Sequence, residues 1–296
     1  LNKQPVIVYS NGVSGILKMA IWNGRFWRKT TIDGAGGTNR TFHEITSPIS
    51  LCVSGSGTTQ KLHMFYADGV DKDLRYANYD GKKVTVEVID GNGPTVNNYE
   101  DAVRVRTASD VSVSNACAIT PAGIQVFYRD ESQGVLLGAF KLNGSSKWVY
   151  ELVDGDRKTD GRTTGDVAFH LAAGFDGKKS YLLYDSVLVI NQKKEATSGA
   201  IRLALRSEID PGKWEFRTLE TSADALAMTG YDVALSVSAK SVFAMWLGAS
   251  ATTIPKPDQI RTAVISTNLS IKSYDTSKYG TPNRWLRTNG TSALFN

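Results

Sequence analysis

The feature that most constrains this chain of 296 residues is a short apolar motif that returns five times. Its clearest copy reads Leu-Arg-Tyr-Ala and begins at Leu74. The alanines that end the motif are 57, 62, 65 and 59 residues apart; they are Ala20, Ala77, Ala139, Ala204 and Ala263. Regular self-similarity over such a period indicates a repeat architecture in which each copy is one supersecondary unit.

Residues 61–91 show what one unit contains. They predict three strands, Leu62–Ala67, Leu74–Tyr79 and Val84–Ile89, each followed by an Asp-Gly pair. Asp-Gly turns between runs rich in β-branched and aromatic residues are a strong hairpin signal. The unit is therefore predicted to be an antiparallel meander.

The other copies predict the same strands and add a fourth. The strand before the motif ends on an aromatic residue in every copy, namely Tyr9, Tyr66, Tyr128, Tyr184 and Trp246. From the second copy onward a strand rich in Ala, Ser and Val precedes the unit, with expected ranges Ile49–Ser54, Val111–Ile119, Val167–Phe175 and Val233–Ser238. The first copy lacks this strand, and the C-terminal Ser292–Phe295 could supply it.

Four-stranded units with small residues on one edge strand suit a radial assembly, where neighbouring sheets converge. We therefore predict an all-β fold, a five-bladed β-propeller with four-stranded antiparallel blades and a ring closed by the C-terminal strand. One domain would span residues 1–296, with blades at 1–34 plus 285–296, 47–91, 110–155, 166–220 and 232–276. A pair of β-sandwiches is the rival architecture, but it does not require the repeat.

Charge and hydropathy exclude some classes of partner. The net charge of +5 is spread along the chain without a Lys/Arg block, so we expect no nucleic-acid partner. No run of 18 apolar residues occurs, so no membrane span is expected. The start of the chain lacks the charged and apolar regions of a signal peptide.

Two cysteines, Cys52 and Cys117, lie in apolar runs that resemble strands. We favour buried free thiols that pack as small hydrophobes, and one bridge between neighbouring strands is the alternative. Neither run offers the electropositive setting of a nucleophilic thiolate.

With these residues in hand, the repeat resembles those of bacterial and fungal lectin-like β-propellers. Among these, fucose-specific fungal lectins use an Arg on the second strand, a Glu on the third and an aromatic residue from the next blade. This chain departs from that pattern, because His63 and Gln125 stand where the Arg is wanted. The positions of the Glu hold Met19, Tyr76, Gly138, Leu203 and Thr262. The resemblance therefore implies the fold and a carbohydrate ligand, but not a fucose site of that type.

Three carboxylates form the first set of candidate site residues. Asp110, Asp166 and Asp232 each open an expected inner strand. We favour a structural role, in which each carboxylate accepts backbone N–H groups of a turn. In the alternative they would hold sugar hydroxyls, a cation or a basic peptide group, or provide the carboxyl pair of a glycosidase. The inner strands contain no Glu, and the Ser-x-Asp-x-Gly-x-Thr-Trp box of sialidases is absent, so no catalytic residue is assigned.

Aromatic residues form the second set of candidates. Trp22 and Tyr79 lie next to turns and could present flat faces to sugar rings, and Trp246 lies in a copy whose loops depart from the repeat. Trp27, Trp148 and Trp214 open the outer strands and are expected to pack between blades.

No metal or cofactor is expected. The three histidines, His43, His63 and His170, lack ligand spacing, and the acidic stretch at Asp68–Asp73 has the wrong spacing for a calcium loop. A solvated hairpin turn explains that stretch better.

These observations favour a recognition module without catalysis, secreted or displayed on a surface, that binds a carbohydrate or glycoconjugate. One alternative is a glycoside hydrolase or lyase that uses the three aspartates. Another is a protein-binding scaffold that uses the enlarged loops at 187–199 and 248–258.

Overall fold

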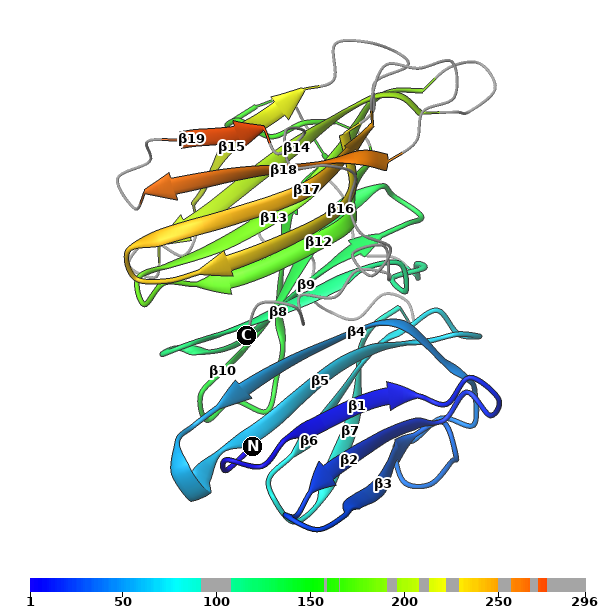
Figure 1. The fold of residues 1–296 in the computed structure, drawn as a ribbon. Coiled ribbons are helices and arrows are strands. Elements are labelled where there is room, and N and C mark those ends of the chain that lie inside the picture. Colours follow the sequence, from blue (N-terminus) through cyan, green and yellow to red (C-terminus); the bar gives the residue numbers. More distant parts are fainter. Residues whose placement is uncertain are drawn as a thin grey trace. The chain divides into compact units, whose positions relative to one another are not determined.

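Strands that follow one another along the chain form five antiparallel sheets in the computed structural model (Figure 1). The structure describes residues 1–91, 108–156, 159–164, 166–190, 196–207, 213–221, 229–249, 257–266 and 271–275. Within them the helical content is one short 3-10 segment, Gly57–Thr59. No helix in this described part is long and apolar enough to cross a membrane. The all-β prediction is confirmed.

Each sheet is a meander in chain order. The first consists of β1 (Val6–Ser10), β2 (Leu17–Trp22) and β3 (Trp27–Asp33). The second consists of β4 (Ile45–Ser54), β5 (Lys61–Asp68), β6 (Leu74–Tyr79) and β7 (Val84–Asp90). The third consists of β8 (Asn115–Thr120), β9 (Gly123–Asp130), β10 (Val135–Leu142) and β11 (Val149–Asp154).

The last two sheets repeat the pattern with longer strands. The fourth contains β12 (Val167–Phe175), β13 (Lys179–Ile190), β14 (Ala196–Ser207) and β15 (Trp214–Thr221). The fifth contains β16 (Thr229–Val237), β17 (Ser241–Ala249), β18 (Pro257–Ser266) and β19 (Ile271–Asp275).

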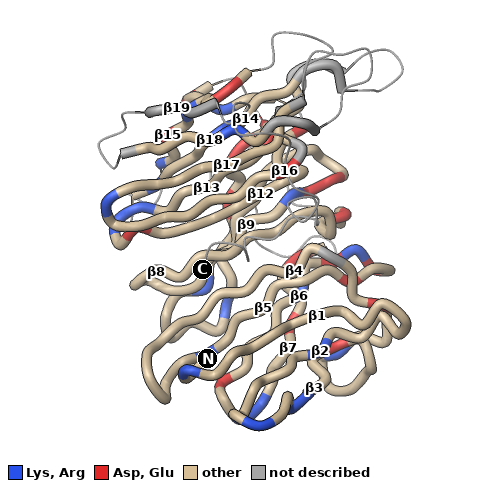
Figure 2. Tube along the Cα trace, in the orientation of Figure 1, with Lys and Arg blue, Asp and Glu red and all other residues tan. Residues whose placement is uncertain are grey.

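Two compact units divide the chain. One contains Leu1–Ile119, Gly123–Gln133 and Gly138–Glu151, and the other contains Thr120–Ala122, Gly134–Leu137 and Leu152–Asn296. The first two sheets belong to the first unit and the last two to the second. Figure 2 shows Lys and Arg interspersed with Asp and Glu along the strands and turns.

The motif that predicted the repeat marks the buried centre of the second strand in the three-stranded first sheet and of the third strand in each of the other four sheets. All five alanines are at most 5% exposed; they are Ala20, Ala77, Ala139, Ala204 and Ala263. In the second sheet Ala77 pairs with Met64 of β5 and Val86 of β7, as the meander predicts. Small side chains at this point let the facing sheets pack closely.

Neighbouring sheets within a unit share one core. In the first unit Leu17 and Met19 of β2 lie in the same buried cluster as Met64 of β5. In the second unit Leu203 of β14 and Val242 of β17 belong to one cluster. The first sheet therefore buries a face against the second, and the fourth against the fifth.

β12 has its predicted bounds, Val167–Phe175, whereas the other inner strands differ from theirs. β4 begins at Ile45, four residues early, and a bulge between Thr46 and Ser50 accommodates Pro48, which cannot donate a ladder hydrogen bond. β8 begins at Asn115, four residues late, after a turn in which Asp110 binds Ser112. The proposed closing strand Ser292–Phe295 lies outside the described residues.

A disulfide joins Cys52 of β4 to Cys117 of β8, with an S–S distance of 2.02 Å and a Cα–Cα distance of 6.2 Å. The favoured prediction of free thiols was wrong, and the alternative bridge is present. The two strands approach closely beside it, where Asn115 donates to the carbonyl of Pro48 at 3.0 Å. The bridge therefore connects the inner edges of the second and third sheets.

Candidate functional site

An acidic residue at the end of the outer strand is bound by a tyrosine from the next sheet, and this link is repeated. The hydroxyl of Tyr66 donates to Asp33 at 2.8 Å. The same bond runs from Tyr128 to Asp90 and from Tyr184 to Asp154, at 2.6 Å each. Burial, followed by the nearby aspartate, raises the pKa of Tyr66 well above its usual value, so this hydroxyl keeps its proton. These repeated residues are scaffold.

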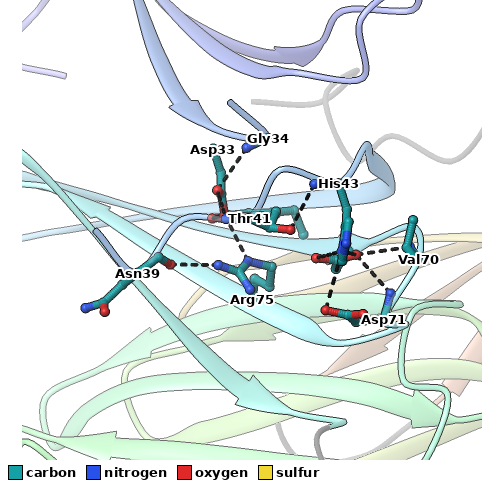
Figure 3. A network of polar contacts seen from close by, with 10 residues as sticks. Asp33, Gly34, Asn39, Thr41, His43, Val70, Asp71 and Arg75 are labelled. Carbon is teal, nitrogen blue, oxygen red and sulfur yellow. Dashed lines mark hydrogen bonds and ion pairs between the residues drawn. The ribbon is translucent and has the colours of Figure 1, made fainter. Parts of the chain in front are cut away.

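In the second and fourth sheets an arginine also binds the aspartate of this link. Arg75, the cross-strand partner of Tyr66, binds Asp33 through Nε at 2.9 Å and the carbonyl of Asn39 at 2.8 Å (Figure 3). Arg202 binds Asp154 in the same way at 3.1 Å, and pairs with Tyr184. A buried carboxylate flanked by a phenol and a guanidinium is well satisfied, which favours a structural role.

The fifth sheet uses different residues for this link. The indole N–H of Trp246 donates to Glu220, and Arg261, its cross-strand partner, forms an ion pair with the same carboxylate. Trp246 is 3% exposed. This candidate site residue is therefore placed in a scaffold position, with little surface for a ligand.

The three candidate aspartates are half-buried; Asp110 and Asp166 precede β8 and β12, whereas Asp232 lies inside β16, at the irregularity between Thr229 and Val233. Asp110 accepts the backbone N–H and the hydroxyl of Ser112 at 3.0 and 2.6 Å. Asp232 accepts the N–H of Val233 at 2.9 Å, and the backbone carbonyl of Asp166 accepts the N–H of Val187. For Asp110 these contacts match the role expected in the connection that enters the strand.

The tryptophans that open or precede the outer strands meet different partners. Lys141 places its ammonium 5.3 Å from the centre of Trp148, and Arg206 places its guanidinium 4.9 Å from Trp214. These two indoles are 6% and 9% exposed, as expected for packing. Trp27 departs from that expectation, because it is 38% exposed.

The reason is the residue across the strand pair. Trp214 pairs with Arg206, whereas Trp27 pairs with Trp22, with ring centres 5.5 Å apart and planes inclined by 55°. In the first sheet the indole of Trp22 therefore occupies the cross-strand position that Arg206 occupies in the fourth sheet. Phe26, in the adjoining turn, is 56% exposed. We call Trp22, Phe26 and Trp27 the aromatic platform.

The turn beneath the platform is fixed by its own side chain. Oδ1 of Asn23 accepts the backbone N–H groups of Arg25 and Phe26 at 3.0 and 2.9 Å. Gly24 takes a φ of +96°, which a residue with a Cβ rarely adopts. The three aromatic rings are therefore held on a hairpin of defined geometry.

Tyr79 lies beside the platform but has a different role from the one predicted. Its ring is 5% exposed, and its hydroxyl donates to the carbonyl of Gly81 at 2.8 Å. The same hydroxyl accepts a hydrogen bond of 3.2 Å from Arg28, the neighbour of Trp27. Of the two residues named for stacking, Trp22 is thus in the platform, whereas Tyr79 positions a guanidinium next to it.

A second polar cluster was missed in the sequence. His63 contacts the hydroxyl of Ser54 through Nε2 and that of Tyr76 through Nδ1, both at 2.7 Å. Tyr76 and Trp148 meet edge to face at 5.4 Å, and Lys141 pairs with Glu87 above them. The signal was present, because His63 and Tyr76 occupy the positions where the fucose lectins carry Arg and Glu.

The electrostatics of this cluster keep it neutral at its centre. Burial first, and then Lys61 and Lys141, lower the pKa of His63 to about 4. The indole N–H of Trp148 is buried without a hydrogen-bond partner among the described residues. Since an unpaired buried donor is costly, this N–H is available to an acceptor that reaches it.

No protein-family model and no curated protein matches the chain. Among solved structures, it is similar to a fucose-specific lectin from Aleuria aurantia, with 14% identity, coverage of 94% of this chain and 89% of the lectin, and a TM-score of 0.46. It is also similar to a NanB sialidase mutant from Streptococcus pneumoniae, with 13% identity, coverage of 78% of this chain and 32% of the sialidase, and a TM-score of 0.41. A third similar structure is a glycosyl hydrolase from Bacteroides ovatus, with 12% identity, coverage of 93% of this chain and 84% of the hydrolase, and a TM-score of 0.38. Resemblance at this level assigns no activity to the chain.

Proposed function

We propose that the chain is a carbohydrate-binding, lectin-like recognition module, secreted or displayed on a cell surface, and without catalytic activity. We further propose that its five sheets are the blades of one β-propeller domain over residues 1–296, closed by the C-terminal residues. The order of the sheets along the chain and the shared cores of neighbouring sheets support this arrangement.

The aromatic platform is the observation that carries the proposed function. Trp27 and Phe26 expose large apolar ring surface on a fixed hairpin, although such residues usually bury it. The C–H face of a sugar ring can stack on an indole, while Arg28 beside it can donate to ring hydroxyls. The site therefore combines a flat apolar surface with a few fixed polar groups, as ligand sites generally do.

Catalysis has less support. A glycoside hydrolase or lyase would need two carboxyl groups facing one pocket, in unlike environments. Two of its three candidates, Asp110 and Asp232, instead accept backbone N–H groups of residues next to them in the chain. The protein-scaffold alternative depends on loops 187–199 and 248–258, which lie partly outside the described residues.

The disulfide supports a location outside the reducing cytosol. Bridges such as Cys52–Cys117 form and persist in oxidising compartments and are rare in the cytosol. Fractionation of the source cells, followed by thiol labelling under denaturing conditions, tests this: the proposal requires the oxidised protein in a secreted or surface fraction.

A glycan array probed with the full chain tests the function, followed by titration of each hit while tryptophan fluorescence is recorded. Binding should quench or shift the indole emission. Trp27→Ala should weaken the affinity for the glycan by about tenfold or more, as expected for loss of an aromatic anchor. Phe42→Ala is the matched control, since Phe42 is an aromatic side chain that is 82% exposed away from the platform.

Three results would count against the proposal. They are an empty array, turnover of a glycoside, and binding that is unchanged in both Trp22→Ala and Trp27→Ala. A hit that depends on Trp148 and His63 instead would move the site to the second cluster.

A further inference from the structure

Three side chains that can bind a metal meet where two loops of the first unit touch (Figure 3). His43 comes from the connection between β3 and β4, and Asp68 and Asp71 come from the turn between β5 and β6. Their donor atoms all lie within 4.8 Å of one another. We propose that His43, Asp68 and Asp71 bind a divalent transition-metal cation, with Zn²⁺ as the best match.

The distances between donor atoms fit such an ion. Nδ1 of His43 lies 3.0 and 3.2 Å from the two carboxylate oxygens of Asp68 and 3.4 Å from Oδ2 of Asp71. Zinc binds imidazole nitrogen and carboxylate oxygen at about 2.0–2.2 Å in a tetrahedron, whose edges are then about 3.3 Å long. Three protein ligands would leave the fourth position for water or a ligand.

The two loops hold the donors in place before any ion binds. The N–H of Gly69 donates to the carbonyl of Glu44 at 2.8 Å, which connects the loops next to His43. Oδ1 of Asp68 accepts the N–H groups of Val70 and Asp71 at 3.0 Å each (Figure 3). A site fixed in this way loses little conformational freedom when it binds a cation.

The site is charged and open on one side. The predicted solvated turn is present between β5 and β6, where Val70 and Asp71 are exposed, but Asp68 at its start is fully buried. The side chains of His43 and Asp71 are 37% and 49% exposed. A buried carboxylate beside a partly exposed imidazole suits a cation that enters from solvent.

The other paired histidine shows what an ordinary ion pair looks like in this chain. His170 contacts Asp185 through Nδ1 at 3.0 Å, and the backbone N–H of His170 donates to the same carboxylate at 2.9 Å. The charge of Asp232 also acts on His170, but among the described residues only His43, Asp68 and Asp71 bring three such donor atoms within 4.8 Å of one another. His170 therefore supplies the control for a site that needs three ligands.

The imidazole also selects the kind of ion. Ca²⁺ and Mg²⁺ prefer oxygen ligands and six or more positions, while Zn²⁺, Co²⁺ and Ni²⁺ accept a nitrogen with two carboxylates. The proposal concerns a surface distinct from the aromatic platform and does not depend on carbohydrate binding.

Isothermal titration of the untagged, metal-free full chain with Zn²⁺ and separately with Ca²⁺ tests the proposal. We expect one Zn²⁺ per chain and no comparable binding of Ca²⁺. Co²⁺ should give the visible absorption of a low-coordinate complex. His43→Gln and Asp71→Asn should each weaken Zn²⁺ binding by at least about tenfold, since even outer-shell changes at metal sites cost this much.

The control variant is His170→Gln, which should bind Zn²⁺ as the unmodified chain does. Circular dichroism verifies that each variant is folded, which is expected because His43 and Asp71 are partly exposed. The proposal is overturned if Zn²⁺ does not bind, if Ca²⁺ binds as tightly, or if folded His43→Gln and Asp71→Asn keep full affinity. A plain ion pair between the three side chains predicts the first of these results.

Discussion

Tyr66 donates its hydroxyl hydrogen to Asp33 across 2.8 Å and so joins β5 of the second sheet to the end of β3 of the first. Both side chains are fully buried. Because equivalent bonds occur at Tyr128 and Tyr184, this contact is a general connection between successive sheets.

Loss of that hydroxyl should destabilise the protein. Tyr66→Phe removes one donor and leaves Asp33 with Arg75 and two backbone N–H groups. A buried acceptor deprived of a partner costs about 1–3 kcal/mol, and the remaining partners place the expected loss at the lower end. Urea unfolding followed by circular dichroism measures it. An unchanged midpoint would show that the hydroxyl contributes nothing.

His63 should make stability depend on pH between about 4 and its ordinary pKa of 6.5. In this window the unfolded chain binds a proton at this residue and the folded chain does not. The contribution of His63 to the free energy of unfolding is therefore fully present above pH 6.5 and is lost as the pH falls towards 4, by up to about 3 kcal/mol in total. Urea unfolding at a series of pH values measures it, and His63→Gln should flatten the slope.

His170 supplies the opposite slope. Burial lowers its pKa, but the hydrogen bond and charge of Asp185 outweigh burial and raise it overall. Its contribution is present at low pH and is lost as the pH rises through the folded value. Titration of the imidazole protons by NMR should show the two histidines displaced in opposite directions, and parallel displacement would contradict both assignments.

Reduction of Cys52–Cys117 should lower stability markedly. The bridge closes a loop with a sequence separation of 65 residues. In the loop-entropy model it restricts the unfolded chain and so raises the free energy of unfolding by about 4 kcal/mol. Unfolding midpoints with and without a reductant measure this, and the double variant Cys52→Ser with Cys117→Ser should match the reduced protein. If reduction leaves the midpoint unchanged while thiol labelling is complete, the bridge does not constrain the unfolded state.

The two kinds of tryptophan should differ in their effect on stability. Trp214→Ala removes a side chain that is 9% exposed and should cost about 3 kcal/mol or more, as large core truncations do. Trp27→Ala removes one that is 38% exposed and should cost about half as much or less. Equal losses would mean that the aromatic platform serves mainly the fold.

The repeat made the sheets predictable from sequence, because each copy contains its own turns and apolar alternation. The bounds of β6, for example, were predicted correctly from Leu74 to Tyr79. Contacts between side chains on paired strands were harder to predict from the sequence. The exposure of Trp27 depends on Trp22 across the strand pair, and only a known register shows that Trp22 replaces a covering cation.

Long-range meetings of loops were not predictable from spacing. His43 lies 25 residues before Asp68, so its contribution required knowledge of how the β3–β4 connection folds against the next turn. The favoured prediction of free thiols was wrong for a similar reason. Cysteines 65 residues apart are adjacent only because inner strands of consecutive sheets meet.

The cations above Trp148 and Trp214 have a consequence for valency. Lys141 and Arg206 each lie over an indole, whereas Trp27 is paired with Trp22, so the side chain beside each indole contributes to how much of its face reaches solvent. Exchange of such a cation for a short side chain would change the number of open faces without altering the strands that carry them. Under the proposed function, a chain with two open faces would engage a branched glycan twice, and its avidity would rise through effective concentration instead of through a stronger individual contact.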